Sequence, residues 1–196
     1  MKTKTLTKIA TAFAVTAVLF TACKKEEKAT PATPPPPANE SEQITTMELT
    51  FTDTANPASV FTAIFNDPDG DGGNAPTQFD TIKLNKGRVY NVEVLLLDKS
   101  KTPVDTISNE VEEEANEHMF FFKFTGAPVS SIGFAYKDMD TNTPPIAIGL
   151  KSQWTIPNTA GTGTAQVILK HQPGVKNGTE TPGDTDIDVT FQTKIN

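Results

Sequence analysis

Cysteine is nearly absent from this chain: Cys23 is the single one among 196 residues. An intramolecular disulfide is therefore excluded, and the core alone has to hold the fold. Tryptophan and tyrosine are also scarce, with one and two residues against twelve phenylalanines. Carbohydrate platforms usually need exposed Trp or Tyr, so the sequence does not favour one. We expect a core built on Phe and aliphatic side chains.

Basic residues are few, since 17 Lys and Arg stand against 24 Asp and Glu. Residues 1–22 contain three of the lysines and no acidic residue. The rest of the chain therefore has 14 basic and 24 acidic residues, a formal charge near −10. This charge disfavours nucleic acid and anionic lipid as partners. Cations, cationic peptides and neutral ligands are compatible with it.

The common signatures of catalysis are missing. The sequence has no Gly-x-Ser-x-Gly elbow and no glycine-rich phosphate loop between a strand and a helix. Carboxylates are numerous, as in any acidic protein, and spacing alone singles out none as a general acid. The sequence therefore predicts a non-enzymatic protein, with a small hydrolase that uses acidic residues as the alternative.

The apolar run at 9–20 is too short to cross a bilayer, which needs about 20 residues. It follows a segment with three lysines and precedes the small residues Thr21 and Ala22. A basic start, a short apolar run and a small-residue cleavage site are typical of a secretory signal. We expect residues 1–22 to be a signal peptide.

The sequence LFTAC at 19–23 resembles the lipobox of bacterial lipoproteins, in which the cysteine is lipidated and becomes the mature N-terminus. The resemblance implies a lipid anchor on Cys23 and hence a membrane partner through that lipid. KKEE at 24–27 resembles the export signal of Bacteroidota surface lipoproteins, with a plain charged linker as the alternative. Together these motifs predict an outer-membrane lipoprotein exposed at the cell surface.

Residues 23–42 contain a proline-rich segment that cannot bury a core. Such a segment adopts an extended polyproline-type conformation of about 3.1 Å per residue. We expect it to be a disordered tether that holds the folded part away from the lipid headgroups.

Residues 43–196 have the length of one domain, and their pattern favours strands over helices. Strands are expected at 44–51, 59–65, 81–84, 89–97, 119–124, 131–137, 146–154, 164–171 and 185–195, with a short helix at 107–118. Closely spaced short strands predict an all-β fold. We expect an antiparallel, Ig-like β-sandwich with at most one short helix.

Three expectations concern how these segments are placed. The segments 81–84 and 89–97 should pair as a hairpin over 85–87. The strongly apolar stretch 92–97 should lie centrally in a sheet. In the last strand, alternation places Ile187 inward, whereas Asp186 and Asp188 should face solvent.

The loop at 66–76 contains the sharpest candidate site, Asp67, Asp69 and Asp71 at alternate positions. Ca²⁺ takes six to eight oxygen ligands, and carboxylates so spaced on a tight loop converge on one point. The spacing resembles EF-hand and thrombospondin type 3 calcium loops, although Gln78 stands where an EF-hand has its bidentate Glu. The alternative is an Asp/Gly turn between two strands.

A second acidic loop contains Asp138 and Asp140, which repeat the Asp-x-Asp pattern. In cadherin-type sandwiches, acidic loops at one pole bind calcium together. We expect the loop after 59–65 and the loop after 131–137 to lie at the same pole.

His118 and His171 are the only histidines. His118 has Glu114 at helical spacing, so with Glu114 or Glu117 it could coordinate a transition metal. No third ligand can be named from the sequence. A surface or rim histidine beside a charged helix is therefore the favoured interpretation.

Three Asp-Thr-aliphatic triplets resemble the O-glycosylation sites of exported Bacteroidota proteins. They begin at Asp53, Asp80 and Asp105. Thr54, near a turn, is the expected acceptor.

The chain as a whole resembles a group of small Bacteroidota lipoproteins, sometimes labelled "type 1 periplasmic binding fold superfamily". The resemblance rests on the lipobox and the charged residues 24–27 that follow it, together with NDPDGDGGNAP at 66–76, EEEANEH at 112–118 and LKHQPGVK at 169–176. The label implies alternating strands and helices, which this sequence lacks. We expect a lipid-anchored domain that binds a protein or glycan partner, with calcium as its candidate ion. A periplasm-facing accessory subunit of an envelope complex is the alternative.

Overall fold

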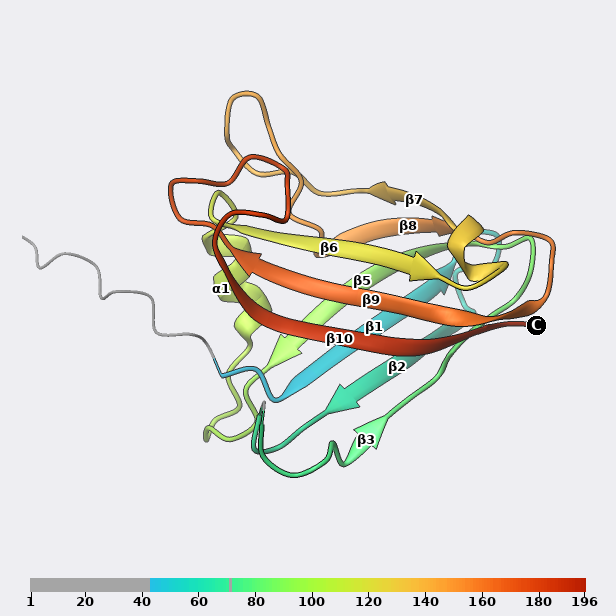
Figure 1. Cartoon of the computed structure of the whole chain (residues 1–196), viewed down its shortest axis with the longest axis horizontal. Coiled ribbons are helices and arrows are strands. Elements are labelled where there is room, and N and C mark those ends of the chain that lie inside the picture. Colours follow the sequence, from blue (N-terminus) through green and yellow to red (C-terminus); the bar gives the residue numbers. More distant parts are fainter. Residues whose placement is uncertain (1–42, 71) are drawn as a thin grey trace, which may run out of the picture. The chain divides into compact units, whose positions relative to one another are not determined.

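The computed structural model describes residues 43–70 and 72–196. The predictions for the signal peptide at 1–22, for lipidated Cys23, for the tether at 23–42 and for Asp71 fall outside these residues. In the part of the chain that is described, ten strands form two sheets around one core, with a single α-helix (Figure 1). The predicted all-β sandwich with one short helix is confirmed.

The larger sheet has six strands, in the order β3 (Gln78–Phe79), β2 (Val60–Asn66), β1 (Thr46–Asp53), β5 (Val89–Leu97), β8 (Lys151–Thr155) and β7 (Gly133–Tyr136). The smaller sheet has four, in the order β4 (Ile82–Leu84), β10 (Asp184–Ile195), β9 (Gly161–His171) and β6 (His118–Thr125). The helices are α1 (Ile107–Glu113) and the 3₁₀ turn η1 (Val129–Ser131).

The core between the sheets follows the two-residue alternation of its regular strands. Phe51 in β1 and Phe191 in β10 are fully buried, whereas their chain neighbours Thr52 and Thr190 are not. Trp154 of β8 meets Phe51 and, across the sandwich, Phe124 of β6, with ring centroids 5.3 and 4.8 Å apart. Burying one such large apolar side chain stabilises the fold by about 1.5–3 kcal/mol. Strand β5, which contains the apolar stretch 92–97, lies between β1 and β8, so its predicted central position is confirmed.

The predicted hairpin between 81–84 and 89–97 is wrong. Strand β4 instead pairs in parallel with the end of β10, in the opposite sheet from β5. Ile82 and Leu84 are fully buried on either side of exposed Lys83, so β4 fills a place at the edge of the smaller sheet. Residues 85–88 then cross to the larger sheet, and the smaller sheet is mixed rather than purely antiparallel.

The predicted helix at 107–118 is shorter than its pattern indicated. Helix α1 ends at Glu113, and the N–H groups of Glu117 and His118 donate to the Glu114 carbonyl in a closing turn. His118 is already the first residue of β6, because it pairs with His171 across the ladder. Long-range strand pairing therefore overrides the local helix propensity of the acidic segment.

The predicted strand at 146–154 is regular only from Lys151 onward. The residues before it connect the two sheets. The carbonyl of Ile148 accepts from the N–H of Phe120 in the smaller sheet, and that of Leu150 accepts from Val94 in the larger one. Because its carbonyls bond to both sheets in turn, the segment forms no regular ladder with either.

One end of the sandwich, which we call the histidine pole, gathers the features that bear on function. Strands β2, β5, β7 and β9 end there, and β6 and β10 begin there, at the left of Figure 1. The pole contains both histidines, the C-terminal end of α1 and both acidic loops.

Candidate functional site

His118 and His171 form a stacked pair at the histidine pole. They are directly opposite each other in the β6–β9 ladder, with ring centroids 4.3 Å apart and planes within 6° of parallel. His118 is 1% exposed and His171 is 5% exposed. The interpretation of His118 as a surface or rim histidine is therefore wrong: the ladder draws it into the interior, against the other histidine.

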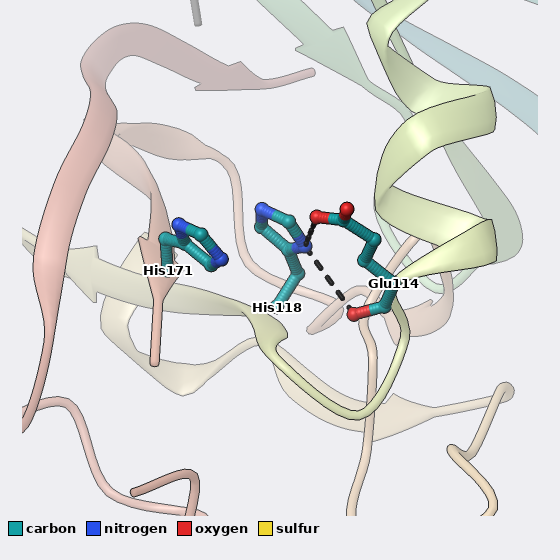
Figure 2. A group of neighbouring side chains, drawn as sticks. All are labelled: Glu114, His118 and His171. Carbon is teal, nitrogen blue, oxygen red and sulfur yellow. Dashed lines mark hydrogen bonds and ion pairs between the residues drawn. The ribbon is translucent and has the colours of Figure 1, made fainter. Parts of the chain in front are cut away.

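Acidic groups surround the pair. Figure 2 shows His118 between His171 and Glu114, whose Oε2 lies 3.9 Å and whose carbonyl oxygen lies 3.3 Å from His118 Nδ1. On the other nitrogens, His118 Nε2 lies 3.8 Å from Asp186 Oδ2, and His171 Nε2 lies 3.4 Å from Glu117 Oε2. Both imidazoles therefore have a carboxylate next to Nε2.

The pKa of His118 is lowered from 6.5 to about 4. Burial is the main cause, and the electrostatic influence of His171 and of Lys176 lowers the pKa further. The hydrogen bond to the Glu114 carbonyl acts in the opposite direction. His118 is therefore neutral at pH 7. A neutral imidazole keeps a nitrogen lone pair, which a metal ligand needs.

Asp186 does not face solvent, contrary to the sequence prediction. The β9–β10 register shifts between Thr185 and Ile187, so Asp186 is the extra residue of a β-bulge and its side chain is only 3% exposed. A bulge breaks the two-residue alternation on which the prediction rested. Burial raises the pKa of Asp186 from 3.8 to about 6, partly offset by His171.

An acidic pocket of about 620 Å³ lies between the end of β2, the loop that follows it and the start of β10. Its carboxylates are Asp67, Asp69, Asp186 and Asp188, and its apolar lining is Ile44, Phe65, Ile187 and Val189. Asp186 belongs to the pocket and also contacts His118, so the pocket and the histidine pair are neighbours. The volume is in the range of ordinary small-ligand sites.

The two described residues of the predicted calcium loop differ in their surroundings. Asp67 is buried, 6% exposed. Asp69 Oδ2 accepts hydrogen bonds from Asn74 N–H and Nδ2, at 2.8 and 2.7 Å, which lower the pKa of Asp69. That carboxylate therefore closes the loop on itself as well as facing the pocket. Calcium binding by Asp67, Asp69 and Asp71 stays a prediction.

The second acidic loop lies at the same pole, as the strand directions require, but at the far side of the larger sheet. Strands β1, β5 and β8 separate β2 from β7, which corresponds to about 19 Å at the usual strand spacing. Asp138 accepts from the N–H groups of Gly149 and Lys151, and Asp140 pairs with Lys176 at 2.9 Å. These carboxylates are engaged in fixing the loop.

Within residues 43–70 and 72–196, the potential ligand atoms of Glu114, His118 and His171 all lie within 4.8 Å of one another. Sequence reasoning named Glu114 and His118 but missed His171 as their third member. The missing information is the register of β6 on β9, which a single sequence does not contain. Among the described helices, none has the length and apolar character needed to cross a membrane.

Thr54, the expected glycosylation site, is exposed in the turn between β1 and β2. Its hydroxyl donates to the Val89 carbonyl at 3.1 Å. Its modification stays a prediction.

Comparison of the chain with protein-family models, with curated proteins and with solved structures finds no match. The functional argument therefore rests on the chain's own residues.

Proposed function

We propose that this chain is a lipid-anchored outer-membrane lipoprotein of the Bacteroidota type, whose β-sandwich is a non-enzymatic binding domain. Its ligand is a cationic group, such as a basic side chain of a partner protein or a small organic cation. One observation carries the cationic ligand: four carboxylates line a single pocket of about 620 Å³. The anchor rests on the lipobox-like sequence at 19–23. The apolar part of the lining suits the aliphatic stem of such a ligand.

The charge of the pocket supports a cationic ligand. Asp186 is buried, and its pKa is raised because no cation compensates the desolvation of its carboxylate sufficiently. A cation in the pocket would favour the ionised form. The overall charge near −10 outside residues 1–22 would attract cations to the domain as a whole.

The pocket can be tested with tetralysine as the probe, titrated into the purified chain in detergent by calorimetry. We expect Asp188→Asn to weaken binding about fivefold or more, because it removes an exposed pocket carboxylate. Asp184→Asn is the matched control, since Asp184 is exposed on the same strand but does not line the pocket. Undetectable binding, or equal losses in the two variants, would contradict the proposed ligand class.

The anchor is tested separately. Cells that express the chain are fed an alkyne-labelled palmitate, and the purified protein is assayed for label. The wild type should be labelled and Cys23→Ser should not. Labelling of intact cells with a membrane-impermeant reagent then tests on which side of the outer membrane the domain lies. Surface display predicts that the protein is labelled. An unlabelled protein favours the alternative of a periplasm-facing accessory subunit.

A small hydrolase is the second candidate, favoured by one observation. Asp186, with a raised pKa, lies in the same pocket as Asp69, with a lowered one, and carboxyl pairs of opposite tendency are typical of acid and base partners. A hydrolytic activity that disappears in Asp186→Asn would support this candidate. If tetralysine binds and mass spectrometry shows that the peptide is not cleaved, the result supports the binding domain.

A further inference from the structure

We propose that Glu114, His118 and His171 form a binding site for a divalent transition-metal ion of the Zn²⁺ type. The site goes beyond the cation pocket, because none of its three ligands lines that pocket. Imidazole nitrogen and carboxylate oxygen are ligands that Zn²⁺ takes readily, whereas Ca²⁺ prefers oxygen alone.

The backbone brings the three ligands together without long flexible connections. The β6–β9 ladder places the two histidines opposite each other, and the turn after α1 places Glu114 four residues before His118. The three ligand atoms lie within 4.8 Å of one another. Zn–N distances of about 2.0–2.1 Å put tetrahedral ligands about 3.3 Å apart, so the ligand atoms need to approach one another by at most about 1.5 Å.

An unsatisfied buried atom points to a ligand at this position. His171 Nδ1 is buried and has no hydrogen-bond partner among the described residues. Buried polar atoms in proteins almost always have a partner, so this one calls for an explanation. A metal ion bound through Nδ1 supplies it.

The groups behind the two imidazoles match a metal site. His171 Nε2 faces Glu117 Oε2 at 3.4 Å, and His118 Nε2 faces Asp186 Oδ2 at 3.8 Å. Metal-bound histidines usually donate their other N–H to a carboxylate or carbonyl, which fixes the ring and its tautomer. A hydrogen bond from His171 Nε2–H to Glu117 leaves Nδ1 of His171 for the metal. His118 Nδ1 contacts the Glu114 carbonyl at 3.3 Å, so metal binding there would require the His118 proton to be on Nε2, toward Asp186. His118 Nδ1 already faces Glu114 (Figure 2).

Three protein ligands leave one tetrahedral position for water or for a donor atom of a bound molecule. The side chain of Glu114 is 55% exposed, so the site is accessible from solvent on that side while both histidines stay buried. We therefore expect the ion to enter from the side of Glu114.

The test is a titration of the purified full chain with Zn²⁺ in competition with a chromophoric chelator. We expect one Zn²⁺ per chain, and affinity at least tenfold lower in Glu114→Gln and in the positioning variant Glu117→Gln. Glu113→Gln is the matched control, an exposed neighbour at the end of α1, and should stay within twofold of wild type. His171→Gln should abolish binding.

Cobalt gives a second readout, because tetrahedral Co²⁺ absorbs strongly in the visible and octahedral Co²⁺ only weakly. The wild type should show the tetrahedral spectrum and Glu114→Gln should lose it. If His171→Gln fails to fold, the comparison of Glu114→Gln with its control Glu113→Gln decides. Less than one-fifth of an equivalent of Zn²⁺, or equal effects of Glu114→Gln and Glu113→Gln, would overturn the proposal. Tetralysine binding is measured independently, so either site can fail alone.

Discussion

Lys176 and Asp140 form a buried ion pair, with side chains 1% and 0% exposed. Lys176 Nζ lies 2.9 Å from Asp140 Oδ2 and donates to the Ala115 carbonyl at 2.7 Å. Asp140 also accepts from the N–H of Ile146 and of Asn142. Burial lowers the pKa of Lys176, whereas the bond to Asp140 opposes that effect. At the scale of single residues, this pair fastens the β9–β10 connection to the loop after β7.

Removing one partner should be far more damaging than removing both. Lys176→Met leaves the Asp140 carboxylate buried without its cation, and we expect a loss of about 3–5 kcal/mol in the free energy of unfolding. Asp140→Asn combined with Lys176→Met should recover part of that loss. Urea unfolding measures both values. A Lys176→Met variant within about 1 kcal/mol of wild type would show that the pair carries little stability.

Asp186 predicts a pH-dependent stability with a definite sign. Its pKa is 3.8 ordinarily and about 6 in the folded chain, so the folded state holds a proton between these values that the unfolded state has lost. Stability from this group is therefore gained as the pH falls from 6 towards 4. Above pH 6 the buried charge costs at most about 3 kcal/mol, at about 1.4 kcal/mol per pKa unit.

Asp186→Asn should accordingly unfold at higher urea than wild type at pH 7.5, in the presence of a chelator. At pH 4 the two should agree within about 0.5 kcal/mol. Asp184→Asn, the exposed control on the same strand, should match wild type at both pH values. An Asp186→Asn variant less stable than wild type at pH 7.5 would mean that the carboxylate is well compensated.

Individual elements show where sequence patterns suffice. Two-residue alternation correctly placed Ile187 inward, where it packs against the core, because β10 after its bulge is a regular strand with one buried face. It failed at Asp186, where a bulge inserts one residue. At β4 the alternation holds, but the hairpin prediction failed because these three residues pair with a strand distant in sequence.

The histidine pair was out of reach of the sequence for a related reason. His118 and His171 are 53 positions apart, and only the register of β6 on β9 makes them neighbours. Helix propensity in the acidic segment before His118 indicated a longer helix and an exposed histidine. The carboxylate spacing of the loop at 66–76 was visible in the sequence. The sequence did not show that the start of β10 lines the same pocket.

The loop after β2 gives a prediction at the scale of an element. If Ca²⁺ binds to this loop, it should raise the melting temperature of the chain, since a ligand that binds only the folded state stabilises it. Asp69→Ala should abolish the rise. Asn74→Ala removes the one hydrogen bond that Asp69 accepts from the Asn74 side chain but keeps the carboxylate, so it should retain the rise. No calcium effect in wild type would make this loop a simple turn.

At the scale of the whole molecule, three groups of interacting ionisable side chains lie at one pole of the sandwich. The acidic pocket, the histidine pair and the Lys176–Asp140 pair all lie there. Gln43, where the continuously described chain begins, lines the pocket.

The most direct test of this account is a backbone NMR titration of the ¹⁵N-labelled chain with tetralysine. A binding domain with its pocket at the histidine pole predicts amide shifts concentrated at Asp67, Asp69 and 185–189, weakened by salt as the exposed carboxylates are screened. Shifts spread evenly over the acidic surface, or confined to the opposite pole, would contradict the pocket as the site of ligand binding.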